Sequence, residues 1–345
     1  MTVPQGLEII EQANLQAFNS LAVPARAEFF CTVTTTEQLQ RALAYARERQ
    51  LVVTALGGGS NLVLAGDISG LVIYLCLRGI SHQPLDSGQV HVSFAAGENW
   101  HQAVQYCLQK GWYGLENLSL IPGNVGAAPI QNIGAYGVEL CDVFVSLQAI
   151  DTQSGEVLLM DRKACQFGYR DSIFKQAEGH RYLITEVTLL LSTTADVNIQ
   201  YPALASALQG TEPTPESVSA AVCQIRREKL PDPAVTPNVG SFFKNPVISK
   251  LLCDSLLEQY SDMPHFEQQD MAIKIPAAWL IDQCGYLGLR VGDVGVHEKH
   301  ALVLVNFGGS GSDILTLAAE IQTAVAVKFN IRLEIEPRVY GRSTT

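Results

Sequence analysis

The sequence predicts a mixed α+β protein of two or three domains. Short runs of apolar and β-branched residues alternate along the 345 residues with longer segments of helical periodicity. A chain of this length can bury more than one hydrophobic core. Hydrophobic residues make up 47% and charged residues 17% of the sequence, so the composition is typical of a globular protein and not of a disordered one.

The composition also argues against several functional classes. The net charge of −11 disfavours a nucleic-acid partner, although a local group of Arg and Lys could still bind a small anion. Apolar runs such as Ala301–Val305 are far shorter than the ~20 residues of a membrane span, and the first residues lack a secretory signal pattern. The eight cysteines form no Cys-x-x-Cys pair, so we expect free thiols in the reducing cytoplasm.

The first candidate site is a turn of three glycines. A helix is expected over residues 34–50, and a strand over 51–56 then leads into Gly57-Gly-Gly-Ser-Asn61. Backbone amides in such a turn can bind phosphate oxygens. The turn is not a P-loop, because no Gly-Lys-Ser/Thr follows, and Leu62 stands where a dinucleotide fingerprint has its third glycine.

The second candidate site is the long uncharged stretch Ile121–Gly137. Strands are expected over 71–77 and 90–95, followed by a helix that ends at Gly111. Glycine lets a backbone N–H approach a ligand directly, so the stretch is either a phosphate cradle or an ordinary multi-turn loop. Its glycines are Gly123, Gly126, Gly134 and Gly137.

The remaining pattern changes near residue 230. A hairpin is expected over 143–159 with its turn at 151–155, then a strand over 182–191 and a helix over 216–229. The segment 226–233 contains two prolines and indicates a domain boundary. Beyond it we expect helices over 277–284 and 313–329, and strands over 301–305 and 331–340.

Some polar residues could carry chemistry, and each also has a structural explanation. Ser241 lacks the Gly-x-Ser-x-Gly of a nucleophile elbow. It could donate a proton only if a cation such as Lys244 stabilised the alkoxide, and otherwise it is a turn serine. Arg170 could bind a carboxylate as a guanidinium fork, or simply pair with Asp171 at the surface.

Other charged residues also have both a functional and a structural explanation. The strand expected over 331–340 places Glu334, Glu336 and Arg338 on one face, as functional groups or as a solvated edge. Lys229 ends its helix, where it could merely complement the helix dipole. The two histidines of Val-His-Glu-Lys-His have no carboxylates at metal-ligand spacing, so no metal site is expected.

Seven short stretches form one ordered set of motifs. They are Leu56-Gly-Gly-Gly-Ser-Asn61, Gly114-Leu-Glu-Asn-Leu118, Ile121-Pro-Gly-Asn-Val-Gly126, Pro129-Ile-Gln-Asn-Ile-Gly-Ala-Tyr-Gly137, Tyr169-Arg-Asp-Ser-Ile-Phe174, Gly240-Ser-Phe-Phe-Lys-Asn-Pro246 and Leu333-Glu-x-Glu336. Together they resemble the UDP-N-acetylenolpyruvoylglucosamine reductases (UDP-N-acetylmuramate dehydrogenases), flavoenzymes of bacterial peptidoglycan synthesis. The resemblance runs from about Asn19 to Gly341. One motif is only suggestive, but all seven in this order are highly specific.

The resemblance implies an α+β architecture. It consists of a two-subdomain FAD-binding fold of the vanillyl-alcohol-oxidase/PCMH type and a smaller C-terminal α+β substrate-binding domain. The first FAD subdomain is expected over 1–80, joined by the C-terminal strand 331–345. The second subdomain is expected over 81–230, with a tyrosine loop near 195–215 as in the family's first type, and the substrate domain over 231–330.

The resemblance also implies a reaction and its residues. The family reduces the enolpyruvyl ether of UDP-N-acetylglucosamine with NADPH, through bound FAD, to UDP-N-acetylmuramate. Ser241 matches the proton donor, and Arg170 and Glu336 match the other catalytic positions. Cofactor-binding positions are Gly57, Gly58, Gly59, Ser60, Asn61, Ile121, Pro122, Gly123, Gly126, Ala127, Ile130 and Gly134. Substrate-binding positions are Gln131, Tyr136, Tyr201, Lys229, Lys244, Asn245 and Arg338.

Two details refine this interpretation. Ser60-Asn61 supplies no His or Cys for a covalent flavin link, so FAD is expected to bind non-covalently. Pro337 stands where the family has an aliphatic residue, which leaves the choice of Glu336 over Glu334 open. The alternatives are an FAD-dependent oxidase of the same fold, or a non-catalytic nucleotide-sugar binder. We expect a monomer without membrane insertion.

Overall fold

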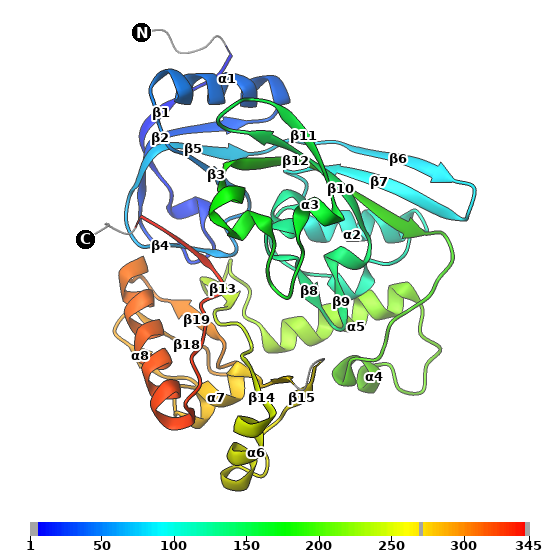
Figure 1. Cartoon of the computed structure of the whole chain (residues 1–345), viewed down its shortest axis with the longest axis vertical. Helices are drawn as coiled ribbons and strands as arrows, with labels where there is room; N and C mark the ends of the chain where they lie inside the picture. Colours follow the sequence, from blue (N-terminus) through cyan, green and yellow to red (C-terminus); the bar gives the residue numbers. More distant parts are fainter. Residues whose placement is uncertain (1–5, 269–271, 342–345) are drawn as a thin grey trace. The chain divides into compact units, whose positions relative to one another are not determined.

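The computed structural model describes residues 6–268 and 272–341, which divide into two compact units (Figure 1). The first unit contains residues up to Ala13, Ala27–Gly59 and Ser69–Glu228, and the second contains Asn14–Arg26, Ser60–Ile68 and the chain from Lys229 onward. The last change of unit falls between Glu228 and Lys229, inside the segment 226–233. The three-part division expected from the resemblance stays a prediction, and the part of its C-terminal strand beyond residue 341 lies outside the described residues.

The first sheet of the first unit has the strand order β1-β2-β5-β3. Its strands are β1 (Ile10–Asn14), β2 (Arg26–Val33), β3 (Val53–Leu56) and β5 (Ile68–Leu75). Helix α1 (Thr36–Glu48) lies across this sheet (Figure 1), because Leu39 and Leu43 share a core with Leu71. The Thr35 side chain accepts a hydrogen bond from the amide of Gln38 and caps the helix.

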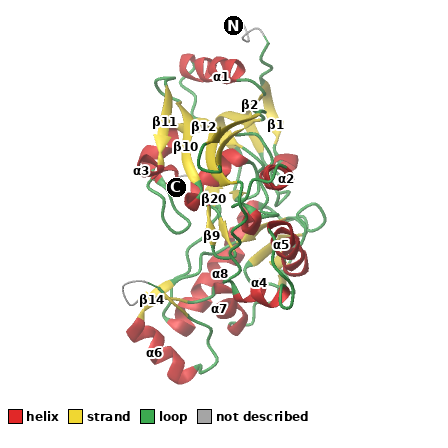
Figure 2. Ribbon diagram, turned by 90° about the vertical axis from the view of Figure 1, so that its right-hand side faces the viewer, coloured by secondary structure: helices red, strands yellow, loops and turns green. Residues whose placement is uncertain are grey.

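The second sheet is antiparallel in the order β11-β10-β12-β7-β6. Its strands are β6 (Ile80–Leu85), β7 (Gln89–Ala95), β10 (Phe144–Asp151), β11 (Val157–Asp161) and β12 (Tyr182–Ser192). Helix α2 (Trp100–Gln109) packs against it through Trp100 and Val104, which share a core with Phe94 (Figure 2). The hairpin expected over 143–159 is confirmed.

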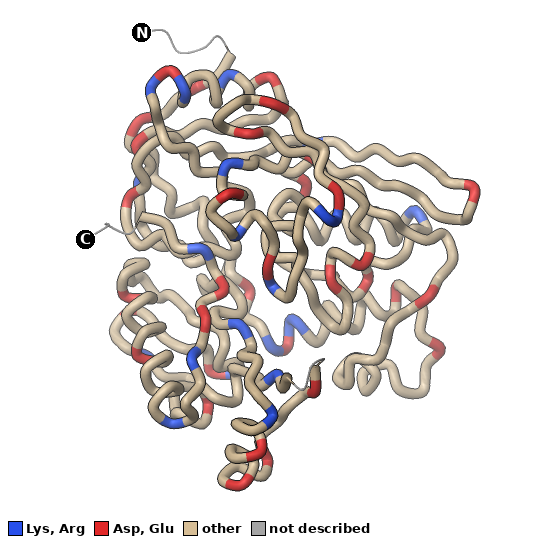
Figure 3. Tube along the Cα trace, viewed as in Figure 1, with Lys and Arg blue, Asp and Glu red and all other residues tan. Residues whose placement is uncertain are grey.

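Helix α5 (Pro215–Lys229) buries the face that its periodicity predicts. Val218, Val222 and Ile225 pack with Leu204 of helix α4 (Pro202–Ala207). The expected tyrosine loop therefore contains a short helix, which begins directly after Tyr201. Basic residues gather in the last turn of α5 (Figure 3). The unit also contains the strands β8 (Gly134–Ala135) and β9 (Val138–Glu139) and the helix α3 (Arg162–Cys165).

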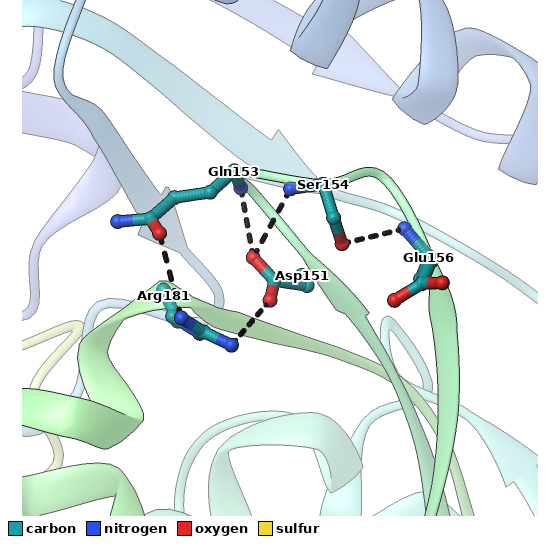
Figure 4. Close-up of polar contacts among 5 residues, drawn as sticks. All are labelled: Asp151, Gln153, Ser154, Glu156 and Arg181. Atoms are coloured by element: carbon teal, nitrogen blue, oxygen red, sulfur yellow. Dashed lines mark hydrogen bonds and ion pairs between the residues drawn. The ribbon is translucent and has the colours of Figure 1, made fainter.

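The turn between β10 and β11 is closed by polar side chains (Figure 4). The buried carboxylate of Asp151 accepts hydrogen bonds from the amides of Gln153 (2.8 Å) and Ser154 (3.4 Å) and forms an ion pair with Arg181 (2.8 Å). The hydroxyl of Ser154 accepts a hydrogen bond from the amide of Glu156 (3.2 Å). The polar groups of the turn are thus satisfied by the turn itself and by Arg181, which directly precedes β12.

The second unit contains three small sheets. One has the order β13-β19-β18-β17, the second β14-β16-β15, and β20 pairs with β4 in parallel. Helix α8 begins with a capping box between Ser310 and Asp313, and its Phe329 ring packs on Trp279 of α7. The elements are β4 (Leu62–Leu64), β13 (Asn238–Ser241), β14 (Val247–Ser249), α6 (Lys250–Gln259), β15 (Phe266–Glu267), β16 (Ala272–Lys274), α7 (Ala277–Gln283), β17 (Arg290–Val291), β18 (Val294–Val296), β19 (Val303–Asn306), α8 (Gly311–Phe329) and β20 (Arg338–Tyr340).

One expectation about the last segment is wrong. A continuous strand over 331–340 is not formed, because β20 covers only Arg338–Tyr340. Before it, Ile335 makes an isolated bridge to Phe243, and the chain then changes partner to β4. Pro337 lies between the two pairings and has no N–H to donate to either. Glu334 and Glu336 therefore lie outside the strand, and only Arg338 lies in it.

Short 3-10 helices complete the described chain. They cover Gln16–Phe18, Glu116–Leu118, Val125–Gln131, Leu140–Asp142, Ile173–Lys175 and Ala177–Arg181. Among the helices of the described ranges, none combines the length and apolar character that crossing a bilayer requires.

Candidate functional site

The two glycine-rich stretches of the first unit lie against each other. A Cβ atom added to Gly58 would stand 2.9 Å from the Cα of Gly123 and 3.3 Å from the Oδ1 of Asn124. Because the nearest atom belongs to backbone, a larger residue at position 58 would push the two stretches apart. Residues 57–59 and 121–126 are therefore neighbours, although more than sixty positions separate them in the sequence.

The turn between β7 and α2 holds the second stretch. The amide of Trp100 donates to the carbonyl of Gly123 (3.0 Å), and the amide of Gly126 donates to the carbonyl of Ala96 (2.9 Å). A Cβ atom on Gly126 would meet the Cβ of Ala96 at 2.5 Å, so only glycine fits there. These two backbone hydrogen bonds attach the loop to the start of α2 and to the residue directly after β7.

Several amides of these stretches remain available to a ligand. Within the described residues, the amides of Gly57, Gly58, Gly59, Gly123 and Asn124 donate no hydrogen bond to a protein acceptor. Gly59 is buried, and a buried amide without an acceptor is rare in folded proteins. Neighbouring unpaired amides form a concave anion site. The pyrophosphate of FAD is such an anion, so the residues present fit this cofactor.

The other cofactor candidates fall in two places. Ile121, Pro122, Ala127, Ile130 and Gly134 belong to the same stretch of the first unit, whereas Ser60 and Asn61 are the first residues of a segment of the second unit. The carbonyl of Ile130 accepts a hydrogen bond from the hydroxyl of Ser172 (2.6 Å), which ties this stretch to the Tyr169–Phe174 motif.

Arg170 has an uncommon backbone conformation. Its φ is 53°, in the left-handed region that residues with a Cβ rarely adopt. Its Nη2 donates to the carbonyl of Gly134 at 2.6 Å, so the guanidinium lies at the end of the glycine-rich stretch. Backbone strain of this kind is typical of functional sites. The catalytic role expected for Arg170 stays a prediction.

Two substrate-binding candidates contact each other through their rings. Tyr136 and Tyr201 pack edge to face with their centroids 5.2 Å apart. The positive charge of Arg226 acts on both Tyr136 and Arg170, because it opposes the rise in the pKa of Tyr136, and the charge of Arg170 adds to burial in lowering the pKa of Arg226. Burial raises the pKa of Tyr136, so its hydroxyl is protonated at neutral pH. A third candidate, Gln131, ends the 3-10 helix of the glycine-rich stretch.

Arg226 is a site residue that the sequence analysis did not single out. It was part of the predicted boundary segment only. The signal was present, because Arg226 follows Val222 by four residues and so lies on the apolar face of α5. A charged residue on a buried helix face normally has a specific partner.

In the second unit, Ser241 and Glu336 lie on neighbouring segments. Ser241 ends β13 and pairs with Val303 of β19, after an irregularity that includes Gly240 with a φ of 70°. The amide of Glu336 donates to the carbonyl of Phe242 at 2.9 Å. The long-range pairing therefore brings together two motifs that the sequence separates by a whole domain.

The two glutamates lie in different surroundings. The Glu334 side chain is 68% exposed and forms an ion pair of 2.5 Å with Lys244. Glu336 is partly buried beside the Ser241 segment. These positions favour Glu336 over Glu334 as the catalytic candidate. They also show that Lys244, a predicted substrate-binding residue, has a carboxylate beside it.

The last substrate candidates have structural partners as well. The Oδ1 of Asn245 accepts a hydrogen bond from the amide of Ala277 (2.9 Å), at the start of α7. The Arg338 guanidinium lies 5.3 Å from the ring centroid of Tyr340. Lys229 is exposed at the first position of the second unit's C-terminal part. In the described ranges, no three His, Cys, Asp or Glu side chains are grouped so that they could hold a metal ion.

The three catalytic candidates belong to different units. Arg170 lies in the first, and Ser241 and Glu336 lie in the second. Each is described within its own unit, and their expected convergence over the flavin stays a prediction.

Comparison with known proteins supports the interpretation of both parts of the chain. Residues 27–161 match the family described as FAD binding domain, and residues 232–340 match the C-terminal domain of UDP-N-acetylenolpyruvoylglucosamine reductase. A UDP-N-acetylenolpyruvoylglucosamine reductase of Pseudomonas fluorescens is 46% identical over 338 residues, which cover 97% of this chain and 99% of that protein. One from Paraburkholderia phymatum is 45% identical over 343 residues, covering 98% and 99%.

A solved structure is similar over the same length. The crystal structure of UDP-N-acetylenolpyruvylglucosamine reductase from Thermus caldophilus matches with a TM-score of 0.66 and 25% identity, covering 97% of this chain and 99% of that one. The fold and the paired glycine turns thus define an FAD-dependent oxidoreductase, and the predicted fold class is confirmed. The chain belongs to the UDP-N-acetylenolpyruvoylglucosamine reductase family.

Proposed function

We propose that this enzyme reduces the enolpyruvyl ether of UDP-N-acetylglucosamine to UDP-N-acetylmuramate, with NADPH as reductant, for peptidoglycan synthesis. The observation that carries the proposal is the full-length similarity to enzymes with this name, together with the unpaired amides that fit FAD. All eight cysteines are free thiols, which supports a cytoplasmic location.

When bound, FAD supplies the hydride that adds to the terminal carbon of the enolpyruvyl group. The addition leaves enolate-like charge beside the substrate carboxylate, and the Arg170 guanidinium would stabilise this charge electrostatically. Ser241 would protonate the adjacent carbon and so set its stereochemistry, and Glu336 would position the serine or relay its proton. The Glu336–Phe242 hydrogen bond supports this division of roles, because it keeps the glutamate next to the Ser241 segment.

The substrate would be held by residues of both units. Gln131, Tyr136 and Tyr201 come from the first, and Lys229, Lys244, Asn245 and Arg338 come from the second. Cations explain how a protein with a net charge of −11 binds an anionic nucleotide sugar. Because Glu334 neutralises part of the Lys244 charge, Lys229 and Arg338 would carry more of the attraction to the diphosphate.

NADPH would use the same cleft before the sugar substrate arrives. The chain has no separate dinucleotide fingerprint, so a ping-pong scheme follows. FAD would be bound non-covalently, because Ser60-Asn61 supplies neither a His nor a Cys for a covalent link. Flavin that remained with the acid-precipitated protein would contradict this point. A monomer is expected, and light scattering of the purified enzyme tests it.

An anaerobic stopped-flow experiment tests the function. NADPH should bleach the flavin absorbance, and the enolpyruvyl substrate should restore it. Ser241→Ala should leave the first phase intact and slow the second by at least about a hundredfold. Ser249→Ala, at the N-cap of α6, is the matched control and should change neither phase.

The glutamates allow a second comparison in the same experiment. Glu336→Gln should slow the restoration of absorbance far more than Glu334→Gln. Rapid aerobic reoxidation without the sugar substrate would instead support an oxidase of the same fold. Protein that is colourless, or yellow but not reduced by NADPH, would support a non-catalytic nucleotide-sugar binder.

A further inference from the structure

Both backbone polar groups of Leu120 are held by side chains. Leu120 directly precedes the glycine-rich stretch that begins at Ile121, and its φ is 59°. Its amide donates to the Nδ1 of His101 at 2.9 Å, and its carbonyl accepts from the Nε of Arg226 at 3.2 Å. His101 belongs to α2 and Arg226 to α5, so two helices hold one residue of the loop.

The two residues before Leu120 are tied to the same helices. The indole Nε1 of Trp100, in α2, donates to the carbonyl of Leu118 at 2.9 Å. The hydroxyl of Ser119 lies 2.7 Å from that of Ser219, in α5, and both serines are buried. The segment 118–120 is therefore attached to α2 and α5 by side chains at every residue. None of these contacts involves a candidate catalytic residue.

The conformation of Leu120 needs this support. A positive φ is unfavourable for a residue with a Cβ and persists only where the surroundings determine it. Without the two hydrogen bonds, Leu120 would relax toward negative φ and rotate the chain that follows. The unpaired amides of Gly123 and Asn124 would then lose their common direction.

We propose that His101 and Arg226 are positioning residues that hold Leu120 in the left-handed conformation and so preform the amides of Gly123 and Asn124 for the FAD pyrophosphate. The two side chains would raise the affinity for FAD by preorganisation, because the loop is ordered when the protein folds and not when the cofactor binds. The residues between Gly114-Leu-Glu-Asn-Leu118 and the glycine-rich loop would thus have a role in cofactor binding, although the reaction itself does not use them.

The state of His101 agrees with this role. Its Nδ1 accepts a hydrogen bond, so the ring must be neutral and carry its proton on Nε2. Burial lowers the pKa of His101, and the cations Arg227 and Arg226 of α5 lower it further, which keeps the ring neutral.

FAD titration of apoproteins tests the proposal, with flavin fluorescence as the readout. His101→Phe keeps a ring but removes the acceptor, and it should raise the Kd for FAD about tenfold. His101→Asn places an amide oxygen near the position of Nδ1 and should stay within about threefold of the wild type. His91→Phe, in β7, is the matched control and should leave the Kd unchanged.

Leu120→Gly provides the decisive comparison. Glycine adopts positive φ without strain, so the double variant His101→Phe/Leu120→Gly should recover most of the lost affinity. Leu120→Gly alone should bind FAD within about threefold of the wild type. If His101→Phe does not fold, Arg226→Gln with and without Leu120→Gly gives the same comparison.

Three results would overturn the proposal. The first is a wild-type Kd for His101→Phe, and the second is a Kd for His101→Asn as high as that of His101→Phe. The third is a double variant that binds no better than the single variant at the helix position, because a packing defect would not be relieved by a glycine at position 120.

Discussion

Two turns of the first unit each follow a strand, but the polar groups of one are paired within the protein and the amides of the other are not. In the β10–β11 turn, the Asp151 carboxylate accepts from two amides of the turn and pairs with Arg181 (Figure 4). In the turn after β3, the amides of Gly57–Gly59 have no protein acceptor among the described residues. The polar groups of the first turn are paired within the protein, whereas the free amides of the second need a ligand as acceptor.

The two turns also differ in charge. The β10–β11 turn contains its own anion, the carboxylate of Asp151, whose side chain is only 4% exposed. The glycine turns contain neutral residues only, so the anion must come from outside. The comparison teaches that a binding turn is recognised by the donors that it leaves unused, and a structural turn by the donors that it satisfies.

Gly58→Val should have the largest effect. The added side chain would displace the backbone of Gly123, which a Cβ alone would already approach to 2.9 Å. We expect the Kd for FAD to rise about a hundredfold, since overpacking against backbone is not easily relieved. The flavin-to-protein ratio after purification and a titration of the apoprotein measure it. A variant that retains a full complement of FAD would show that the two stretches do not form the site.

Asp151→Asn should act on stability and not on cofactor binding. The new amide nitrogen would face Arg181, which is itself a donor, while the remaining side-chain oxygen could still accept from the two turn amides. We expect the free energy of unfolding to fall by about 2 kcal/mol, discounted because Arg181 is partly exposed. Urea unfolding of the apoprotein measures this, and the Kd for FAD should not change. Glu37→Gln, which removes the exposed pair with Arg41, is the control and should cost less than about 0.5 kcal/mol.

Gly155→Ala should have a smaller effect in the same turn. Gly155 has a φ of 81°, and an added Cβ would lie 2.8 Å from the Nη1 of Arg47, a flexible side-chain end. The expected loss is about 1 kcal/mol, with unchanged FAD content. Gly88→Ala is the control, because Gly88 has a φ of 70° and an added Cβ would make only an ordinary contact to Thr193. Its loss of unfolding free energy measures the cost of the positive φ alone. Loss of FAD from Gly155→Ala would remove the distinction between the two turns.

Lowering the pH should produce the smallest effect, a loss of folding stability. Since burial and the neighbouring Arg227 and Arg226 lower the pKa of His101, the unfolded chain takes up a proton before the folded one. The stability that this histidine contributes is complete above its unfolded pKa of about 6.5 and falls as the pH decreases below it. Urea midpoints between about pH 7.5 and pH 5.5 should therefore decline less in His101→Asn than in the wild type. Equal declines would mean that His101 does not titrate in this way.

Much of the local structure could be predicted from the sequence. The N-cap at Thr35, the buried face of α5 and the β10–β11 hairpin follow from residue type and periodicity within single segments. The glycine-rich stretches were also visible, because few functions other than close backbone approach explain so many glycines among neutral residues. The ordered motifs then identified the family, which the comparisons confirm.

Other features depended on the tertiary structure. The strand expected over 331–340 is cut short because Pro337 lies where the chain changes from Phe243 to β4, and neither partner is visible locally. The contact of Arg226 could not be assigned from its own segment, since the Leu120 carbonyl to which it donates lies on a distant part of the chain. The left-handed conformation of Leu120 could not be predicted either, because leucine rarely adopts a positive φ.

Residue type and spacing along the chain indicated most of the helices and strands, and the glycines that adopt positive φ without strain. These properties depend on the presence of a Cβ, on capping groups and on periodicity, all of which act over a few residues. Only the tertiary structure decided which glycine turn faces which, and which glutamate lies beside Ser241. Those choices depend on hydrogen bonds and packing between segments far apart in the chain, and no local preference encodes them.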